Sequence, residues 1–229
     1  MVSAIIVAAG KGARMNDAVR KQYLNLAGYP IVSHSLITFD ECQQIEDIFL
    51  VVPQKDINYC QKNILAPLTL QKKVHLVPGG AHRQASVYNG LLEIDQKTTT
   101  AVIHDGVRPF VSSENLTSCI LGAKDFGACI LAIPASDTLK HVEQSGVIKK
   151  TLPRDTVWLA QTPQAFQYSL IMKAHETARY DGFIGTDDAL LVERMGKDVK
   201  VVRGDKANIK ITTREDLVVA QAMLDAGLV

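Results

Sequence analysis

The sequence predicts an α/β protein with a mostly parallel central sheet, because short apolar β-branched runs alternate with helix-spaced segments. The expected strands lie at residues 4–8, 47–52, 74–77, 101–104, 129–133 and 199–202. The expected helices lie at residues 31–39, 56–65, 82–94, 113–126, 168–179, 187–195 and 214–226. Ligands of such sheets bind beyond the carboxyl ends of the strands, so the loops after each strand are where chemistry is expected.

Residues 136–157 interrupt this alternation. Apolar and polar residues alternate there around Gln144-Ser145-Gly146, which is the pattern of a β-hairpin. The segment is too polar for a core, and a solvated hairpin is marginally stable alone, so we expect an arm that docks on a second subunit. A free surface hairpin is the alternative. No repeat or linker is visible, so residues 1–229 are interpreted as one domain that carries this arm.

The chain has 229 residues and a formal net charge of +1. A general binder of nucleic acid or of a membrane surface would present a broad positive field, so neither partner is expected. The four cysteines show no C-x-x-C spacing, and buried free thiols suit a reducing cytoplasm. We also expect no signal peptide, since Met1 leads into the first strand without a basic segment.

A loop of small residues follows the first strand, Ala8-Ala9-Gly10-Lys11-Gly12-Ala13, and three cations come after it, Arg14, Arg20 and Lys21. Small residues let backbone N–H groups approach a phosphate, and the cations neutralise its charge. The dinucleotide fingerprint fails because Met15 replaces its third glycine, and the P-loop fails because no hydroxyl residue follows Gly10-Lys11. We therefore interpret the segment as a cradle for a nucleoside triphosphate; a glycine-rich turn without a ligand is the alternative.

Later loops add further candidates. Gly79-Gly80 and the Ser86 hydroxyl could face a flat ligand such as a base, although a simple turn is the plainer explanation. Asp105 ends a strand beside a glycine, where it suits a ribose hydroxyl or Mg²⁺, or only caps a turn. The uncharged segment 158–166, placed among the loops, fits a sugar or polyol.

Three other residues have a structural explanation. Asp187 and Asp188 precede an apolar helix and resemble an N-cap, and Lys210 stands in an expected short strand, where lysines usually face solvent. The histidines show no zinc spacing, and no G-x-S-x-G motif indicates a hydrolase nucleophile.

Taken together, these loops resemble the 2-C-methyl-D-erythritol 4-phosphate cytidylyltransferase family, the CTP-using enzymes of the non-mevalonate isoprenoid pathway. The resemblance spans nearly the whole chain in family order. The matching motifs are A-A-G-x-G-x-R-M (8–15), K-Q-Y (21–23), G-G-x-x-R-x-x-S (79–86), H-D-x-x-R-P (104–109), D-T-x-K (137–140), A-Q-T-P-Q-x-F (160–166), T-D-D (186–188) and N-I-K-x-T (208–212). One departure is Arg20, where the family usually has proline, so loop rigidity is expected to fall and positive charge to rise.

The resemblance implies a Rossmann-like sheet of the nucleotidyltransferase type and the following roles. The implied catalytic residues are Arg14, Lys21 and Lys210. The implied nucleotide site comprises Ala8, Ala9, Gly10, Gly12, Arg14, Lys21, Gly79, Gly80, Arg83, Ser86 and Asp105. The implied polyol phosphate site comprises Asp105, Arg108, Thr138, Arg154, Thr162, Thr186 and Lys210. Thr138 and Arg154 would reach a partner's site across a homodimer, and Mg²⁺ would be held mainly by the CTP phosphates, with Asp105 as its candidate protein ligand.

The residue types suit this chemistry. A phosphate monoester, with a second pKa of about 6, is already mostly ionised at neutral pH, so no general base is needed. The barrier is repulsion between two anions, which cations must offset while they hold the groups in line. Three alternatives remain: a cytidylyltransferase for ribitol or ribulose 5-phosphate, a nicotinamide-dependent reductase, and a nucleotide-binding module without catalysis.

Overall fold

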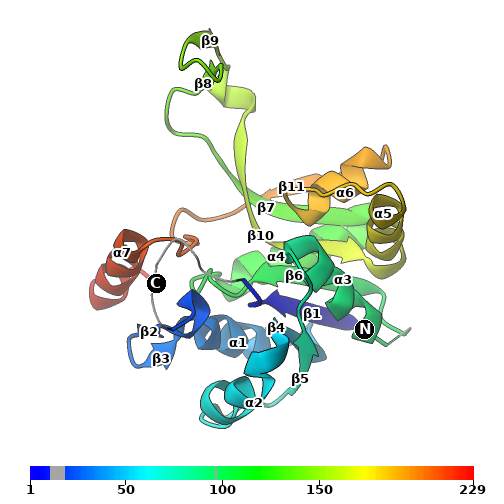
Figure 1. Cartoon of the computed structure of the whole chain (residues 1–229), viewed down its shortest axis with the longest axis vertical. Coiled ribbons are helices and arrows are strands. Elements are labelled where there is room, and N and C mark those ends of the chain that lie inside the picture. Colours follow the sequence, from blue (N-terminus) through cyan, green and yellow to red (C-terminus); the bar gives the residue numbers. More distant parts are fainter. Residues whose placement is uncertain (11–18, 96) are drawn as a thin grey trace.

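The computed structural model describes residues 1–10, 19–95 and 97–229. Within these ranges the central sheet has seven strands in the order β11-β7-β10-β6-β1-β4-β5 (Figure 1). Every neighbouring pair is parallel except the two that involve β10, which runs antiparallel to β6 and β7. The strands are β1 (Val2–Val7), β4 (Asp47–Val52), β5 (Lys73–Pro78), β6 (Thr100–Asp105), β7 (Ala128–Pro134), β10 (Trp158–Gln167) and β11 (Lys200–Arg203). The mostly parallel α/β sheet predicted from the sequence is confirmed.

Helices cover both faces of this sheet. One face packs against α1, α2 and α4 around side chains such as Ile6, and the other packs against α3, α5 and α6 around side chains such as Ile5. Successive residues of β1 are thus buried in opposite layers, which explains why the strand is apolar throughout. The helices are α1 (Ile31–Glu41), α2 (Ile57–Cys60), which continues as a π-helical turn (Gln61–Leu65), α3 (Arg83–Glu93), α4 (Ser113–Phe126), α5 (Tyr168–Tyr180), α6 (Asp188–Arg194) and α7 (Arg214–Asp225).

A smaller apolar cluster lies beside this main body. There α7 contributes Ala220, which packs with Leu26 and Ile211 next to the short pair β2 (Asn25–Leu26) and β3 (Tyr29–Pro30). The four cysteines are buried and free, as the sequence predicts. In the part of the chain that the structure describes, no helix has the length and apolarity to cross a membrane.

The expectations for two segments were wrong. Residues 158–166 belong to a strand rather than a loop: β10 lies between β6 and β7, and its residues 161–166 are buried. Its polar side chains made it look like a loop. From inside the fold, Gln161, Thr162 and Gln164 bind a loop, the end of β6 and the start of α6, respectively. Residues 208–212 form a loop rather than a strand, so Lys210 is held by a connection that precedes α7.

The predicted hairpin is present as an arm that projects away from the sheet (Figure 1). Strands β8 (Lys140–Val142) and β9 (Ile148–Thr151) pair antiparallel, and all seven of their residues are exposed. Gly146 in the turn has a φ of +85°, a left-handed conformation that favours glycine. The arm leaves the body between β7 and β10, and so it is anchored at both ends by the central sheet.

Candidate active site

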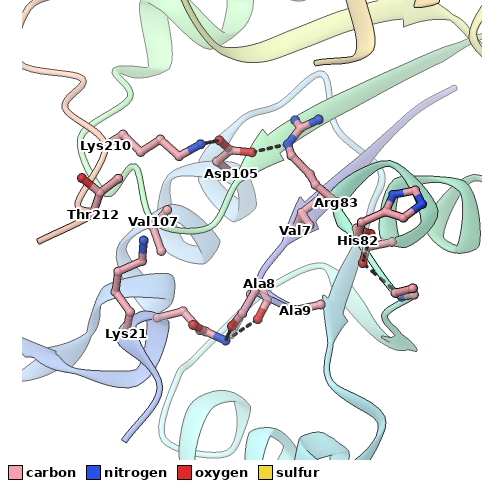
Figure 2. A pocket seen from close by; sticks show the side chains of 15 residues that line it. Val7, Ala8, Ala9, Lys21, His82, Arg83, Asp105, Val107, Lys210 and Thr212 are labelled. Atoms are coloured by element: carbon pink, nitrogen blue, oxygen red, sulfur yellow. Dashed lines mark hydrogen bonds and ion pairs between the residues drawn. The ribbon is translucent and has the colours of Figure 1, made fainter. Parts of the chain in front are cut away.

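A cavity of about 560 Å³ opens at the carboxyl edge of the sheet, where the loops after β1, β5 and β6 meet (Figure 2). The strand order reverses here, since β1 leads to β4 on one side and pairs with β6 on the other. Such a switch point is the expected ligand site of an open α/β sheet, and the volume suits a nucleotide-sized ligand. The predicted residues that line the cavity are Ala8, Ala9, Gly10, Lys21, Gly80, Arg83, Ser86, Asp105 and Lys210.

Two glycines of the loop after β5 pack too closely against their neighbours to carry a side chain. A Cβ on Gly79 would lie 2.3 Å from the Cβ of Ala9, and one on Gly80 would lie 2.6 Å from the Cβ of Ala85. Gly79 therefore packs behind the cavity wall and brings the loops together, while Gly80 forms part of the wall. The glycine pair found in the sequence is explained by this close packing.

The start of α3 supplies one wall of the cavity. His82 is the N-cap of the helix, and its Nδ1 accepts a hydrogen bond from the backbone N–H of Ala85. The Ser86 hydroxyl accepts from the N–H of Gly80 and donates to the carbonyl of His82, both at 3.0 Å. Ser86 thus fixes the glycine loop against the first turn of the helix.

Asp105 lies between two cations at the end of β6. Its Oδ1 is 2.8 Å from Nε of Arg83, and its Oδ2 is 2.6 Å from Nζ of Lys210 (Figure 2). Although burial alone would raise the pKa of the Asp105 carboxyl, these cations hold that pKa well below its usual range. Asp105 is therefore ionised at neutral pH, and it fixes the two cationic side chains at the cavity.

The Arg83 guanidinium continues this network into the protein interior. Its Nη1 lies 2.7 Å from Oδ2 of Asp188, and Oδ1 of Asp188 is 3.0 Å from Nε2 of His175. Asp188 and His175 are both buried. The Oε1 of Gln164 accepts the backbone N–H of Asp188 and so helps to position that residue. Arg83 is held by one carboxylate at the cavity and by another behind it. Sequence reasoning missed His175, because an isolated histidine in a helix gives no signal.

A second network lies beneath Asp105. Nε2 of His104 must donate to the carbonyl of Arg108, which can only accept, so Nδ1 is left to accept from the Thr162 hydroxyl at 3.1 Å. That hydroxyl in turn accepts the backbone N–H of Asp105 at 3.0 Å. Burial lowers the pKa of His104 to about 4, which keeps the ring neutral and suited to both bonds. Thr162 and His104 thereby set the position of Asp105 from below.

Lys21 enters the cavity from the opposite wall and extends toward Val107 and Thr212 (Figure 2). It begins a 3₁₀ turn, Lys21–Tyr23. The next residue, Gln22, is buried, and its amide donates to the carbonyls of Ala8 and Gly10. This amide joins the turn directly to the loop after β1, a function that the sequence alone did not indicate.

The remaining predicted residues lie away from the lining of the cavity. Arg108 donates to the carbonyl of Asn208 at 2.6 Å and so supports the loop that carries Lys210, while burial lowers the pKa of its guanidinium. Thr186 is exposed just before α6, and Thr138 and Arg154 are exposed on the arm. Gly12 and Arg14 fall outside the described residues, and the roles given to them stay predictions.

Asp105 is poorly suited to hold a metal ion in this arrangement, because each of its carboxylate oxygens is already bound to a cation. Among residues 1–10, 19–95 and 97–229, no group of three or more histidine, cysteine, aspartate or glutamate side chains is arranged to hold a metal. The prediction that Asp105 is a metal ligand is not supported by its contacts.

Comparison with known proteins agrees with this geometry. The family model described as "IspD: 2-C-methyl-D-erythritol 4-phosphate cytidylyltransferase" matches residues 2–226. Proteins named 2-C-methyl-D-erythritol 4-phosphate cytidylyltransferase are similar over nearly their full length. The one from Syntrophus aciditrophicus is 47% identical over 97% of this chain and 95% of its own, and the one from Pelotomaculum thermopropionicum is 44% identical over 98% and 94%.

Solved structures give the same result. The 4-diphosphocytidyl-2C-methyl-D-erythritol synthase of Anaerococcus prevotii superposes with a TM-score of 0.88 at 35% identity, and covers 98% of this chain and 96% of its own. The 2-C-methyl-D-erythritol 4-phosphate cytidylyltransferase of Thermus thermophilus gives 0.79 at 30% identity over 98% and 100%. The chain therefore belongs to the 2-C-methyl-D-erythritol 4-phosphate cytidylyltransferase family, whose members are nucleotidyltransferases.

Proposed function

We propose that the cavity transfers the cytidylyl group of CTP to the phosphate of 2-C-methyl-D-erythritol 4-phosphate. A phosphate oxygen of the polyol attacks the α-phosphorus, the bond from that phosphorus to the β-phosphate oxygen breaks, and pyrophosphate leaves. The observation that carries the proposal is the convergence of Lys21, Arg83 and Lys210 from three separate segments of the chain on one cavity at the switch point of the sheet. This reaction contributes to isoprenoid precursor biosynthesis.

We assign the nucleotide to the side of the cavity formed by the loops after β1 and β5. Their small residues Ala8, Ala9, Gly10 and Gly80 line the cavity and leave room for a flat base and for phosphates beside the backbone. Arg83 also lines the cavity, and Asp105 and Asp188 hold its guanidinium in place at the edge toward β6.

The catalytic step depends on the cations. Both reactants are anions, so bringing their phosphorus atoms together costs Coulomb energy that Lys21 and Lys210 offset from two sides of the cavity. The proposed nucleophile is already ionised at neutral pH, so the site needs no base. Asp105 keeps Lys210 and Arg83 in fixed positions before the substrates arrive, which reduces the reorganisation needed in the transition state.

A divalent cation would reach this site on the CTP phosphates, where it would neutralise negative charge. The carboxylate of Asp105 is engaged by Arg83 and Lys210, and we therefore assign it no metal. The test is pyrophosphate release with and without chelator at fixed CTP: loss of turnover that Mg²⁺ restores supports the requirement, and unchanged turnover contradicts it.

Lys21 provides the main test of the proposed chemistry. Lys21→Ala should lower kcat by about a hundredfold or more, a loss of roughly 3 kcal/mol of transition-state stabilisation. The assay is pyrophosphate release from CTP with 2-C-methyl-D-erythritol 4-phosphate, run beside ribitol and ribulose 5-phosphates to compare acceptors. The exposed Lys197, which does not line the cavity, gives the matched control Lys197→Ala. Near-normal turnover of Lys21→Ala would contradict the assignment.

We further propose a homodimer in which the arm of each subunit completes the site of the other. Support comes from the exposed apolar side chains of the arm, among them Val147 (61% exposed) and Ile148 (57% exposed), which leave it without a core of its own. Thr138 and Arg154 lie on this arm and would bind the polyol phosphate of the partner's site. The four free buried cysteines support the proposal that the enzyme acts in the cytoplasm.

Mixing two inactive variants tests the shared site. Lys21→Ala removes a cation from the body of a subunit, and Arg154→Ala removes one from its arm. In a mixed dimer one site receives both defects and the other receives neither, so the mixture should regain about a quarter of wild-type activity. If the arm served its own subunit, the mixture would regain no activity beyond the sum of its parts. Sedimentation of each variant checks that it still dimerises.

A further inference from the structure

Three residues around Lys21 hold the turn that presents it to the cavity. Arg20 precedes Lys21, and Gln22 and Tyr23 follow it. Gln22 binds the loop after β1, as described above. Arg20 and Tyr23 both reach Asp56, at the end of the turn Gln54–Asp56 that follows β4. The segment is therefore fastened to two different strand ends, with Lys21 between the attachment points.

Asp56 is the centre of the second attachment. Its Oδ2 lies 2.6 Å from Nε of Arg20 and accepts a weaker bond from the Tyr23 hydroxyl at 3.4 Å. The Arg20 and Asp56 side chains are only 21% and 16% exposed, so solvent screens their attraction less than it does for a surface pair. Tyr23 is itself buried, packs on the ring of Tyr59 and accepts a hydrogen bond from the thiol of Cys60.

These contacts change the interpretation of Arg20. The sequence suggested that an arginine at this position would add positive charge to the nucleotide loop. Its guanidinium is instead neutralised by Asp56, and Arg20 does not belong to the lining of the cavity. The backbone of Arg20, with φ −65° and ψ 140°, has the extended conformation that a proline ring would impose, so the ion pair restrains a position where a ring could do the same.

We propose that Arg20 and Asp56 are positioning residues for Lys21. Their ion pair fixes the turn Lys21–Tyr23 so that the Lys21 ammonium stands where the reacting phosphates bind. This inference rests on the function proposed above for Lys21. Loss of either partner weakens the attachment of the turn at Asp56 and lets the ammonium shift, which should reduce transition-state stabilisation more than it weakens the binding of either substrate.

A double-mutant cycle tests the proposal. Wild type, Arg20→Ala, Asp56→Asn and the double variant are compared for kcat and for KM of each substrate by pyrophosphate release. Each single variant should lose about tenfold in kcat with KM for the polyol phosphate nearly unchanged, and the double variant should lose no more than either single one, because both remove the same restraint. Arg194→Ala is the matched control, since Arg194 pairs with Asp181 at 2.7 Å and neither residue lines the cavity.

Different results would contradict the positioning role of Arg20 and Asp56 and the proposed function itself. If Arg20 acted as a phosphate-binding charge, Asp56→Asn would preserve or raise activity, and Arg20→Ala would mainly raise KM for CTP. Losses that multiply in the double variant would also overturn the proposal. Absence of pyrophosphate release by the wild type would instead overturn the proposed function itself, before any variant is compared.

Replacement by proline gives a second readout. Arg20→Pro restores a restraint on φ without restoring charge, so it should recover a substantial part of the kcat lost in Arg20→Ala. A folded Arg20→Pro variant, with the thermal midpoint of wild type but a kcat no better than that of Arg20→Ala, would contradict the positioning role. A merely stabilising ion pair would lower the thermal midpoint in Arg20→Ala and leave kcat at low temperature unchanged.

Discussion

The carboxyl edge of the sheet and the arm use the same kinds of ion pair in opposite surroundings. At the sheet edge, Asp188 is 1% exposed and lies 2.7 Å from Arg83, which in turn contacts Asp105. On the arm, Glu143 is 51% exposed and lies 3.6 Å from Lys149, which is 60% exposed. The chemistry of the groups is similar, and the access of water differs.

This difference determines what each pair can do. A buried pair has lost its hydration, so each charge depends on its protein partner and holds that partner in place. An exposed pair exchanges freely with water and contributes little to stability or geometry. The sheet edge is therefore preorganised by the chain itself, whereas the exposed Glu143–Lys149 pair contributes little to the geometry of the arm.

Removal of the buried carboxylate should have the largest effect. Asp188→Ala leaves Nη1 of Arg83 and the His175 ring without their shared partner in a dry environment. We expect the free energy of unfolding to fall by about 3–5 kcal/mol, as measured by urea denaturation. Asp188→Asn keeps the shape and should cost less. A loss below about 1 kcal/mol in Asp188→Ala would show that water reaches this pair and that the contrast with the arm is wrong.

The pH dependence of stability should also originate at the sheet edge. Burial lowers the pKa of His104 from 6.5 to about 4, so between these values the unfolded chain binds more protons than the folded one. The contribution of the neutral His104 ring to the free energy of unfolding is complete above pH 6.5. This contribution is lost as the pH falls toward 4, by at most about 3 kcal/mol. His104→Gln should flatten this part of the curve. His141→Gln, in exposed β8, should leave it unchanged, and an equal effect of both variants would contradict the assignment.

Much of the sheet could be predicted because its strands are apolar on both faces, and the order of strands and helices follows from that alternation. The pattern failed at β10. Gln161, Thr162 and Gln164 are buried there, and they hydrogen-bond a loop, the end of β6 and the start of α6, respectively, all distant in the chain. A strand stabilised through polar contacts with such distant segments has no local signature in its sequence.

The same limit applies to the site. The residues that line the cavity follow strand ends, so a motif search could find Lys21, Arg83 and Asp105. Residues that act one layer behind them are specified only by folding. His175 lies in α5, and its contact with Asp188 is a property of packed helices. Arg20 shows the converse: its charge was visible, but its partner Asp56 was not, and the partner decides what the charge does.

A smaller effect is expected where the loop after β1 touches the loop after β5. Gly79→Ala would place a Cβ 2.3 Å from that of Ala9, which forces the loops apart. We expect a loss of about 1–3 kcal/mol in the free energy of unfolding, with a raised KM for CTP. Gly10→Ala is the matched control, because no atom of the described residues lies within 4 Å of the added Cβ. Equal unfolding curves for the two variants would show that the close approach is not maintained in solution.

The smallest effect is expected on the arm, and it also tests whether the arm stays exposed. Glu143→Ala removes a carboxylate that is half in solvent, so dilute protein should lose no more than about 0.5 kcal/mol. If the arm docks on a second subunit, the exposure of this pair changes with association, and the loss should then grow with protein concentration. Measuring the thermal midpoint across a hundredfold range of concentration separates the two cases. A concentration-independent effect above 1 kcal/mol would mean that the pair is already shielded within one chain, contrary to the difference from Asp188 on which the comparison rests.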